Sequence, residues 1–212
     1  MDDIKIAADL IRNGSLVAFP TETVYGLGAD ATNESAIRQI YSLKGRPSNN
    51  PLIVHVNDIM QAKEIVVFNR AAEILADVFW PGPLTLVLPL RKGFKLAPSV
   101  TAGLKTVAIR IPSHKTARAL IKASGLPLAA PSANPSGYVS PTSSLHVRSH
   151  FADLYILEGN NSEYGLESTI IDLSSEQPKI LRYGFITPEA LSKVLGVEVD
   201  YVTDLAIKAP GM

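Results

Sequence analysis

The chain has 212 residues, of which twenty are basic, twenty are acidic and none is cysteine. This length favours one domain with a sizeable buried core over two small ones, and a content of 46% hydrophobic and 19% charged residues is typical of an ordered globular protein. The missing cysteines exclude disulfides and thiolate zinc sites, and the balanced charge offers no general attraction to nucleic acid.

The N-terminus does not resemble a secretion signal, because Asp2 and Asp3 make it acidic and no continuous apolar core follows. The sequence also contains no run of the ~20 apolar residues that a membrane-spanning helix needs. These features predict a cytoplasmic protein that makes no membrane contact.

Five segments place apolar residues at helical spacing. They begin near Ile4, at Asn33 and Asn69, after Ser113 and at Thr187. Asn33 and Asn69 are predicted N-caps, because their side chains can accept hydrogen bonds from the free N–H groups of a first helical turn. Gly14 and Gly125 are predicted to end the helices that start near Ile4 and after Ser113.

Short runs of β-branched and apolar residues between these helices predict strands. The first run, Leu16 to Phe19, leads into a predicted loop from Pro20 to Asp30 that is dense in hydroxyls and glycine. Further strands are predicted at 52–56, 84–89, 106–111, 127–130, 154–157, 168–173 and 179–183. Helices and strands interleave early, and three strands follow one another from residue 154 on. This order predicts a single α/β domain over residues 1–200 with a mixed sheet, followed by a C-terminal tail at 201–212.

Lys44 and Arg46 form the first group that could bind an anionic ligand. Arg46 precedes Pro47, which favours an extended conformation, and residues two apart in an extended segment point to the same side. Both cations can then face one ligand. The alternative is structural: a helix C-terminus favours positive charge through its dipole, and a solvated turn could follow.

Ser132 and Asn134 form a second group, on the segment that leaves the predicted strand 127–130. Asn134 also precedes a proline, so the two side chains are expected on one side, at a strand end where binding loops are common. Taken alone, these small residues and prolines could equally form a stiff turn.

Arg110 lies on one face of the predicted strand 106–111, together with Thr106 and Ala108. An arginine within so apolar a run needs a partner, and its fork suits a carboxylate. A structural salt bridge is the alternative. The segment Glu167 to Asp172, with Arg182 on a nearby strand, is a further but weaker candidate.

Several familiar catalytic patterns are missing from the sequence. It has no Walker loop, no GxGxxG and no G-x-S-x-G, so a P-loop, a Rossmann nucleotide site or a serine nucleophile elbow is not expected. His146 and His150 are four residues apart but lack the glutamate of a zinc-protease motif. We therefore interpret them as a solvated helix face and predict no protein-built metal site.

Six segments occur together and in order over about residues 5–190. They are PTETVYGLGADA (20–31), KGRPSNNPLIVHV (44–56), WPGPLTLVL (80–88), VAIRIP (107–112), APSANPSG (130–137) and ESTIIDL (167–173). Together they resemble the YrdC-like family, whose best-characterised members are threonylcarbamoyl-AMP synthases. The family signature K-x-R … S-x-N falls on Lys44, Arg46, Ser132 and Asn134.

The resemblance implies a YrdC-like fold: a single α/β domain with a twisted mixed sheet, flanking helices and a concave, locally positive ligand surface. It implies a nucleotidyltransferase that joins L-threonine, bicarbonate and ATP into L-threonylcarbamoyladenylate and pyrophosphate. The product serves N6-threonylcarbamoyladenosine formation in tRNA. Longer relatives continue into a second C-terminal domain, so the resemblance implies a short-form member.

The resemblance also implies roles for individual residues. Lys44 and Arg46 would be catalytic. L-threonine would be bound by Thr23, His55, Arg110, Ala130 and Ser168. ATP would be bound by Arg46, Asn50, Thr106, Ser132, Asn134, Ser140 and Arg182.

The resemblance implies no organic cofactor and no metal held by the protein alone; Mg²⁺ would arrive with ATP. The expected partners are the three substrates, the proteins that transfer the threonylcarbamoyl group to tRNA, and at most a weak contact with tRNA itself. Two other readings are an RNA-binding module of the same fold and a carbamoyl-adenylating relative. Neutral charge disfavours the first. The absence of the zinc-finger and acylphosphatase modules that accompany such relatives disfavours the second.

Overall fold

The computed structural model describes residues 2–201 and residue 209. Its helices are α1 (Asp2–Arg12), α2 (Glu34–Lys44), α3 (Ile59–Ile65), α4 (Arg70–Phe79), α5 (Pro98–Thr101), α6 (Lys115–Ser124), α7 (Ser144–His150) and α8 (Pro188–Leu195). Its strands are β1 (Val17–Phe19), β2 (Gly26–Asp30), β3 (Ile53–His55), β4 (Leu84–Pro89), β5 (Thr106–Arg110), β6 (Leu128–Ala129), β7 (Tyr155–Ile156), β8 (Thr169–Asp172), β9 (Lys179–Arg182) and β10 (Asp200–Tyr201). The predicted tail at 201–212 lies almost wholly outside the described residues.

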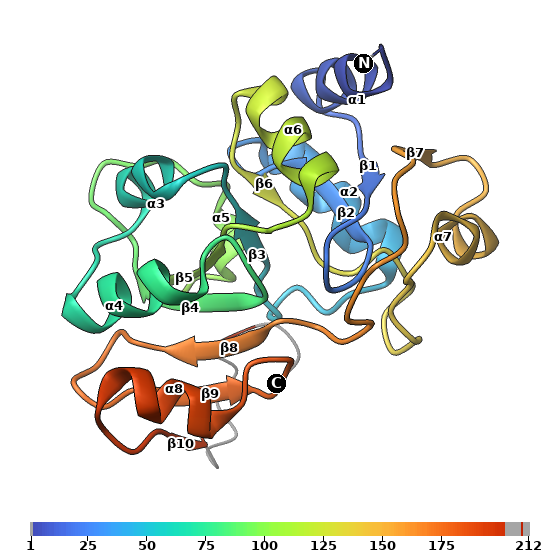
Figure 1. The fold of residues 1–212 in the computed structure, drawn as a ribbon. Coiled ribbons are helices and arrows are strands. Elements are labelled where there is room, and N and C mark those ends of the chain that lie inside the picture. Colours follow the sequence, from blue (N-terminus) through green and yellow to red (C-terminus); the bar gives the residue numbers. More distant parts are fainter. Residues whose placement is uncertain (1, 202–208, 210–212) are drawn as a thin grey trace.

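The strands of the described residues form one sheet in the order β10-β9-β8-β4-β5-β3-β6-β2-β1-β7. Neighbours run parallel at β10/β9, β4/β8, β3/β5 and β1/β7, and antiparallel elsewhere. This arrangement confirms the predicted single α/β domain with a mixed sheet (Figure 1). Among the described residues, no helix combines the length and apolarity that crossing a membrane requires.

Local capping explains where the helices begin and end. Asn33 accepts a hydrogen bond from the Ala36 N–H and Asn69 accepts one from the Ala72 N–H, as predicted. Gly125 ends α6 in the left-handed region with φ of 70°. The N-cap of α6 is His114, whose Nδ1 accepts from Thr116 N–H.

The structure corrects the prediction that residues 20–30 form a loop, because Gly26–Asp30 is strand β2, antiparallel to β1. Glycine is depleted in strands, so this sequence resembles a turn. Gly28 is needed here for close packing: a Cβ on it would lie 2.6 Å from Cε1 of the Phe19 ring. A second feature was not predicted, since β7 joins β1 at the opposite edge of the sheet from β8 and β9.

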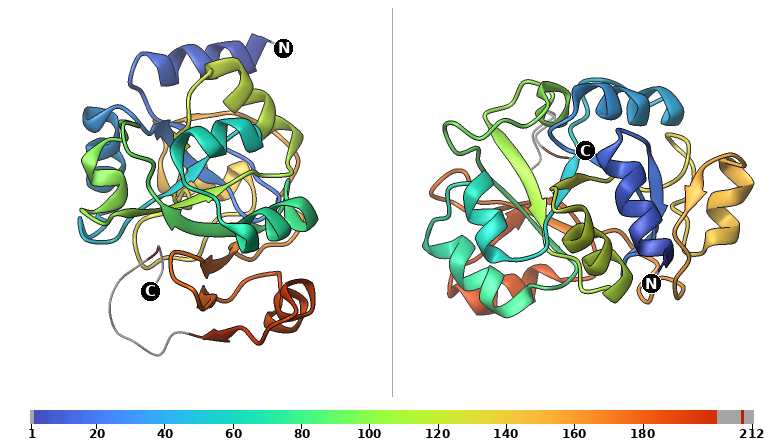
Figure 2. Two further views of the ribbon diagram at one scale, coloured as in Figure 1. Left: turned by 90° about the vertical axis from the view of Figure 1, so that its left-hand side faces the viewer. Right: turned by 90° about the horizontal axis from the view of Figure 1, so that it is seen from above.

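Hydrophobic side chains pack on both faces of the sheet. The main core joins one face to α2, α4 and α8 through residues such as Ile37, Leu75, Leu86 and Leu191. A second cluster lies under α1 and α6, which pack side by side (Figures 1 and 2).

A third, small cluster occupies the other face of the central strands. It contains Ile53, Val87, Ala108, Ile170, Leu181 and Ala209. Because side chains alternate along a strand, this face also carries His55 next to Ile53 on β3 and Arg110 next to Ala108 on β5. The candidate site therefore lies on the sheet face opposite the main core.

Candidate functional site

A polar cleft of about 260 Å³ opens on this face. Strand ends and the loops that follow them supply its walls. The polar side chains that line it are Thr21, Thr23, Lys44, Arg46, Asn50, His55, Arg110, Ser132, Asn134, Ser136, Tyr138, Ser140, Glu167, Ser168 and Arg182. Ala130 lines it as well, so the structure brings together every site residue predicted from the sequence except Thr106.

Thr106 does not line this cleft. It lies at the start of β5, on the same strand face as Ala108 and Arg110 but four residues from the arginine. The side chain is half-buried. Its predicted part in ATP binding stays a prediction, and it would require a ligand that extends along β5 beyond the cleft.

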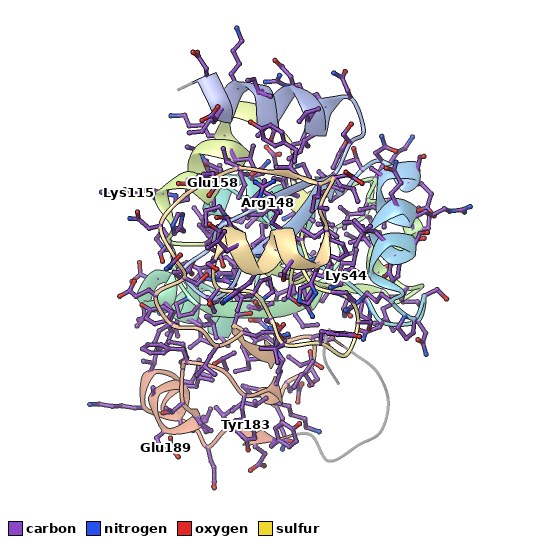
Figure 3. The ribbon with its side chains drawn as sticks, turned by 90° about the vertical axis from the view of Figure 1, so that its right-hand side faces the viewer. Lys44, Lys115, Arg148, Glu158, Tyr183 and Glu189 are labelled. Carbon is purple, nitrogen blue, oxygen red and sulfur yellow. The ribbon has the colours of Figure 1, made fainter. Side chains whose placement is uncertain are left out.

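Lys44 lies at the end of α2 (Figure 3), and its side chain lines the cleft. The prediction that Lys44 and Arg46 share an extended segment is wrong, because Lys44 is helical and Gly45 is left-handed with φ of 60°. The two side chains nevertheless meet at one cleft. Lys44 is buried, and its Nζ donates to the backbone carbonyls of Ser132 and Asn134. Burial, reinforced by the charge of Arg46, lowers the pKa of Lys44 to about 8.

Arg46 organises the loop that follows it. Its Nη2 donates to Asn50 Oδ1 at 2.5 Å and to the Pro51 carbonyl at 2.8 Å, and its Nε donates to the Asn50 carbonyl at 3.1 Å. The loop therefore wraps around the guanidinium. This arrangement fixes Asn50 and Arg46 relative to each other at the cleft wall.

Asn134 stabilises the same loop whose carbonyls accept hydrogen bonds from Lys44. Its Nδ2 donates to the carbonyls of Pro135 at 2.9 Å and Tyr138 at 2.8 Å. The stiff turn considered as an alternative is thus present, and it forms one wall of the cleft. The Oδ1 atom of Asn134 is buried and has no partner among the described residues, so a hydrogen-bond acceptor remains free at this wall.

Arg110 forms the buried ion pair that sequence analysis left open as an alternative. Its Nη2 donates to Glu22 Oε1 at 2.6 Å, its Nη1 to Thr23 Oγ1 at 3.0 Å and its Nε to the Gly82 carbonyl at 3.1 Å. A guanidinium carries five N–H donors, so one on each Nη atom remains for a ligand. Burial would raise the pKa of Glu22, but the charge and hydrogen bond of Arg110 hold it below its ordinary value.

His55 is buried beside Arg110, at the end of β3. Burial, together with the positive charge of Arg110, lowers the pKa of His55 to about 3. The imidazole is therefore neutral at physiological pH, and its Nδ1 has no partner among the described residues. So weak a base does not take a proton from an ammonium group, but a neutral ring can exchange hydrogen bonds with a ligand.

Ser168 and Arg182 lie next to each other in the wall of the cleft. Arg182 donates from Nη2 to Ser168 Oγ at 3.0 Å, and Ser168 Oγ lies 2.8 Å from Thr85 Oγ1. Arg182 also forms an ion pair with Glu167, whose Oε1 accepts from Ser140 Oγ at 3.0 Å.

Sequence reasoning missed Glu22 as a part of the site, and it named Glu167 only within a weaker candidate segment, with Arg182 on a nearby strand. Each glutamate precedes a predicted site residue, Thr23 or Ser168, so adjacency was an available signal. The importance of Glu22 comes from its pairing with Arg110, 88 residues away, which a local pattern does not identify. No group of three or more metal-ligating His, Asp or Glu side chains occurs in the part of the chain that the structure describes.

The sequence matches a known protein family over most of its length. A profile of the Sua5/YciO/YrdC family, described as "Telomere recombination", matches residues 9–184. The chain belongs to this family. The match spans all the strands that supply cleft residues, from β2 to β9.

Two curated relatives in the Sua5/YciO/YrdC family carry the name threonylcarbamoyl-AMP synthase. The protein from Pyrococcus abyssi is 51% identical over 199 residues, which cover 91% of this chain and 57% of the relative. The protein from Bacillus subtilis is 51% identical over 199 residues, which cover 92% of this chain and 57% of the relative. The chain thus spans little more than half the length of these relatives.

A solved structure of a family member shares this fold closely. The crystal structure of P. abyssi Sua5 complexed with L-threonine has a TM-score of 0.93 and 46% sequence identity. The alignment covers 99% of this chain and 63% of that one. The YrdC-like fold predicted from the motifs is therefore confirmed.

Proposed function

We propose that this chain carries the catalytic domain of a threonylcarbamoyl-AMP synthase, a nucleotidyltransferase that acts in tRNA modification. The observation that supports this most is the 51% identity to two proteins of that name over nine-tenths of this chain. The cleft adds chemical support, because cations, hydroxyls and one carboxylate converge in it. Its substrates would be ATP, L-threonine and bicarbonate.

The part of the cleft around Arg110 suits the amino acid. The two remaining N–H groups of Arg110 can bind a carboxylate, and charge-assisted pairs of this kind are among the stronger hydrogen bonds. Neutral His55 and the hydroxyls of Thr23 and Ser168 offer hydrogen bonds to an ammonium or hydroxyl group. With Ala130 on the wall, these are the residues that we propose bind L-threonine.

The rest of the polar lining forms the nucleotide half of the cleft. We propose that Arg46, Asn50, Ser132, Asn134, Ser140 and Arg182 bind ATP, with Thr106 contributing along β5. Lys44 keeps one ammonium N–H beyond the two that it gives to backbone carbonyls, which allows it to contact a phosphate.

The chemistry needs no protein nucleophile. The threonine amine adds to the carbon of CO₂ or bicarbonate and gives a carbamate, with loss of a proton or of water. A carbamate oxygen then attacks the α-phosphorus of ATP, and the bond to pyrophosphate breaks. The chain's own residues align the three reactants and stabilise negative charge through Lys44 and Arg46.

A Mg²⁺ ion that comes with ATP would neutralise charge on the phosphates. Mg²⁺ prefers oxygen ligands and commonly uses one or two carboxylates together with substrate phosphates. Glu167 fits this pattern, since it is the one carboxylate among the described residues that line the cleft.

The decisive experiment is pyrophosphate release by the purified chain with Mg²⁺. Release should require ATP, L-threonine and bicarbonate together, and the omission of any one should abolish it. Release that continues without threonine would contradict the proposal and would favour carbamoyl adenylation. No release at all, with tRNA bound instead, would favour the RNA-binding reading.

A further inference from the structure

Glu167 lies in the nucleotide half of the cleft, beside Ser140 and Arg182. Its Oε1 accepts a hydrogen bond from Ser140 Oγ at 3.0 Å, and its Oε2 pairs with Arg182 Nη1. Burial would raise its pKa, but Arg182, hydrogen bonds from Ser140 and Ser132, and the charge of Lys44 hold the pKa below its ordinary value. Four residues that we propose act on ATP thus surround one ionised carboxylate.

This negative charge is unusual for its surroundings. Among the described residues that line the cleft, Lys44, Arg46, Arg110 and Arg182 are cations and Glu167 is the one anion. Glu22 balances Arg110 from behind the lining, so Glu167 is the charge that faces the nucleotide half.

A carboxylate in this position opposes a bare triphosphate. Like charges a few ångströms apart repel each other, and the repulsion is stronger in a partly buried site than in water. The same carboxylate accepts the hydroxyl hydrogen of Ser140 and one N–H of Arg182, and these two donors are unavailable to phosphates until it releases them. A divalent cation reverses both effects, because it attracts carboxylate and phosphate oxygens together.

We propose that Glu167 is a ligand, direct or through water, of the divalent cation that accompanies ATP, and that it makes nucleotide binding depend on that cation. This inference rests on the proposed function, because it assumes that the nucleotide half binds ATP. It assigns Glu167 a role beyond orienting Arg182. A purely structural role would weaken ATP binding equally with and without the cation.

The test is the dissociation constant of ATP alone, measured by calorimetry without threonine so that no reaction occurs. Each protein is titrated once with Mg²⁺ and once with EDTA. For the unaltered chain, Mg²⁺ should strengthen ATP binding by roughly tenfold or more. This estimate follows from the loss of metal affinity, about 10–100-fold, that usually results when a group supporting a bound metal is removed.

In Glu167→Gln the ratio of the ATP dissociation constant in EDTA to that in Mg²⁺ should fall to about threefold or less. The neutral amide neither repels phosphate nor binds the cation well. Affinity in EDTA should rise. Glu167→Asp keeps the charge and should retain a larger ratio than Glu167→Gln. Paramagnetic resonance of Mn²⁺ with ATP should show weaker Mn²⁺ retention in the Gln variant only.

Glu158→Gln is the matched control, because Glu158 is an exposed carboxylate that pairs with Arg148 at 3.7 Å and does not line the cleft (Figure 3). Its ratio should equal that of the unaltered chain. An unchanged ratio in a folded Glu167→Gln, or equal weakening in both conditions, would overturn the inference while leaving the proposed function intact. If the unaltered chain binds no ATP even with Mg²⁺, the proposed function itself fails.

Discussion

At the scale of single residues, Arg110 combines a buried ion pair with unused hydrogen-bond donors. Glu22 pairs with it inside the protein, Thr23 and the Gly82 carbonyl accept two further hydrogen bonds, and one N–H on each Nη atom remains. Both members of the ion pair have side chains only 3% exposed. Removing one member therefore leaves an uncompensated buried charge, which costs about 3–5 kcal/mol of stability.

This double role leads to a prediction about Arg110→Ala. The variant should be less stable, because Glu22 is left as a buried charge without its partner. It should also raise the threonine KM far more than the ATP KM, because a lost charge-assisted contact costs about 1.5–3 kcal/mol. The double variant Arg110→Ala, Glu22→Gln should regain much of the stability but none of the threonine affinity. Thermal unfolding and steady-state kinetics measure the two effects separately. A double variant that also regains threonine affinity would contradict a carboxylate clamp.

Lys44 leads to a prediction about pH. With a pKa lowered to about 8, Lys44 is mostly protonated below that pH in the free protein and mostly neutral above it. If the ammonium form contacts phosphate, kcat/KM for ATP should fall as pH rises through about 8, since this parameter reports groups of the free enzyme. The kcat profile should decline only at higher pH, because bound phosphates favour the charged form. A kcat/KM profile that stays flat to pH 9.5 would exclude this role.

At the scale of elements, the cleft depends on how closely β8 and β9 approach. A Cβ on Gly184, just after β9, would lie 2.4 Å from both the Glu167 carbonyl oxygen and the Thr169 nitrogen. Backbone atoms cannot move aside as a side-chain end can. The glycine thus allows Arg182 to reach Ser168, and the strand pair sets the distance between two cleft residues.

We therefore expect Gly184→Ala to be costly for function as well as for stability. It should destabilise the protein by about 1–3 kcal/mol, as overpacking does, and it should raise the KM values of both ATP and threonine. Gly196→Ala is the control, because Gly196 ends α8 with φ of 69° and has open space around it. That change should cost stability alone, as measured by denaturant unfolding. Equal KM effects in both variants would show that the close approach at Gly184 does not affect substrate binding.

At the scale of the whole molecule, separate hydrophobic clusters support different parts of the fold. The cluster under α1 and α6 contains Leu120, while the cluster on the cleft face of the sheet contains Leu181, next to Arg182. Both leucines are almost fully buried. Leu120 lies on α6 and does not line the cleft, although its cluster extends to Ala130 at the cleft wall. Leu181, by contrast, is the neighbour of a residue that lines the cleft.

A matched pair of truncations tests this division. Leu120→Ala and Leu181→Ala should each reduce stability by about 2–5 kcal/mol, the usual range for a buried leucine. Only Leu181→Ala should also raise the ATP KM, because the space it leaves lets β9 and Arg182 shift. Unfolding curves and kinetics at a temperature where both variants are folded give the comparison. Similar KM changes in both would contradict local support of the cleft by the third cluster.

The sequence by itself determined the features that depend on neighbours along the chain. Asn33 and Asn69 cap helices because the groups they satisfy lie three residues away. The apolar runs became β3, β4, β5, β8 and β9 because a short, continuous run of apolar residues bounded by turn residues favours a strand that is buried on both faces. Ordered motifs also identified the family, and every site residue that the resemblance implied, except Thr106, lines the cleft.

Tertiary structure decided what depends on residues far apart in the chain. It placed glycine-rich β2 in the sheet, because Phe19 on the neighbouring strand fills the space that Gly28 leaves. It joined Lys44 to the carbonyls of Ser132 and Asn134, and Glu22 to Arg110, across more than eighty residues. Such contacts arise only when the sheet brings its loops together, and no spacing in the sequence encodes them.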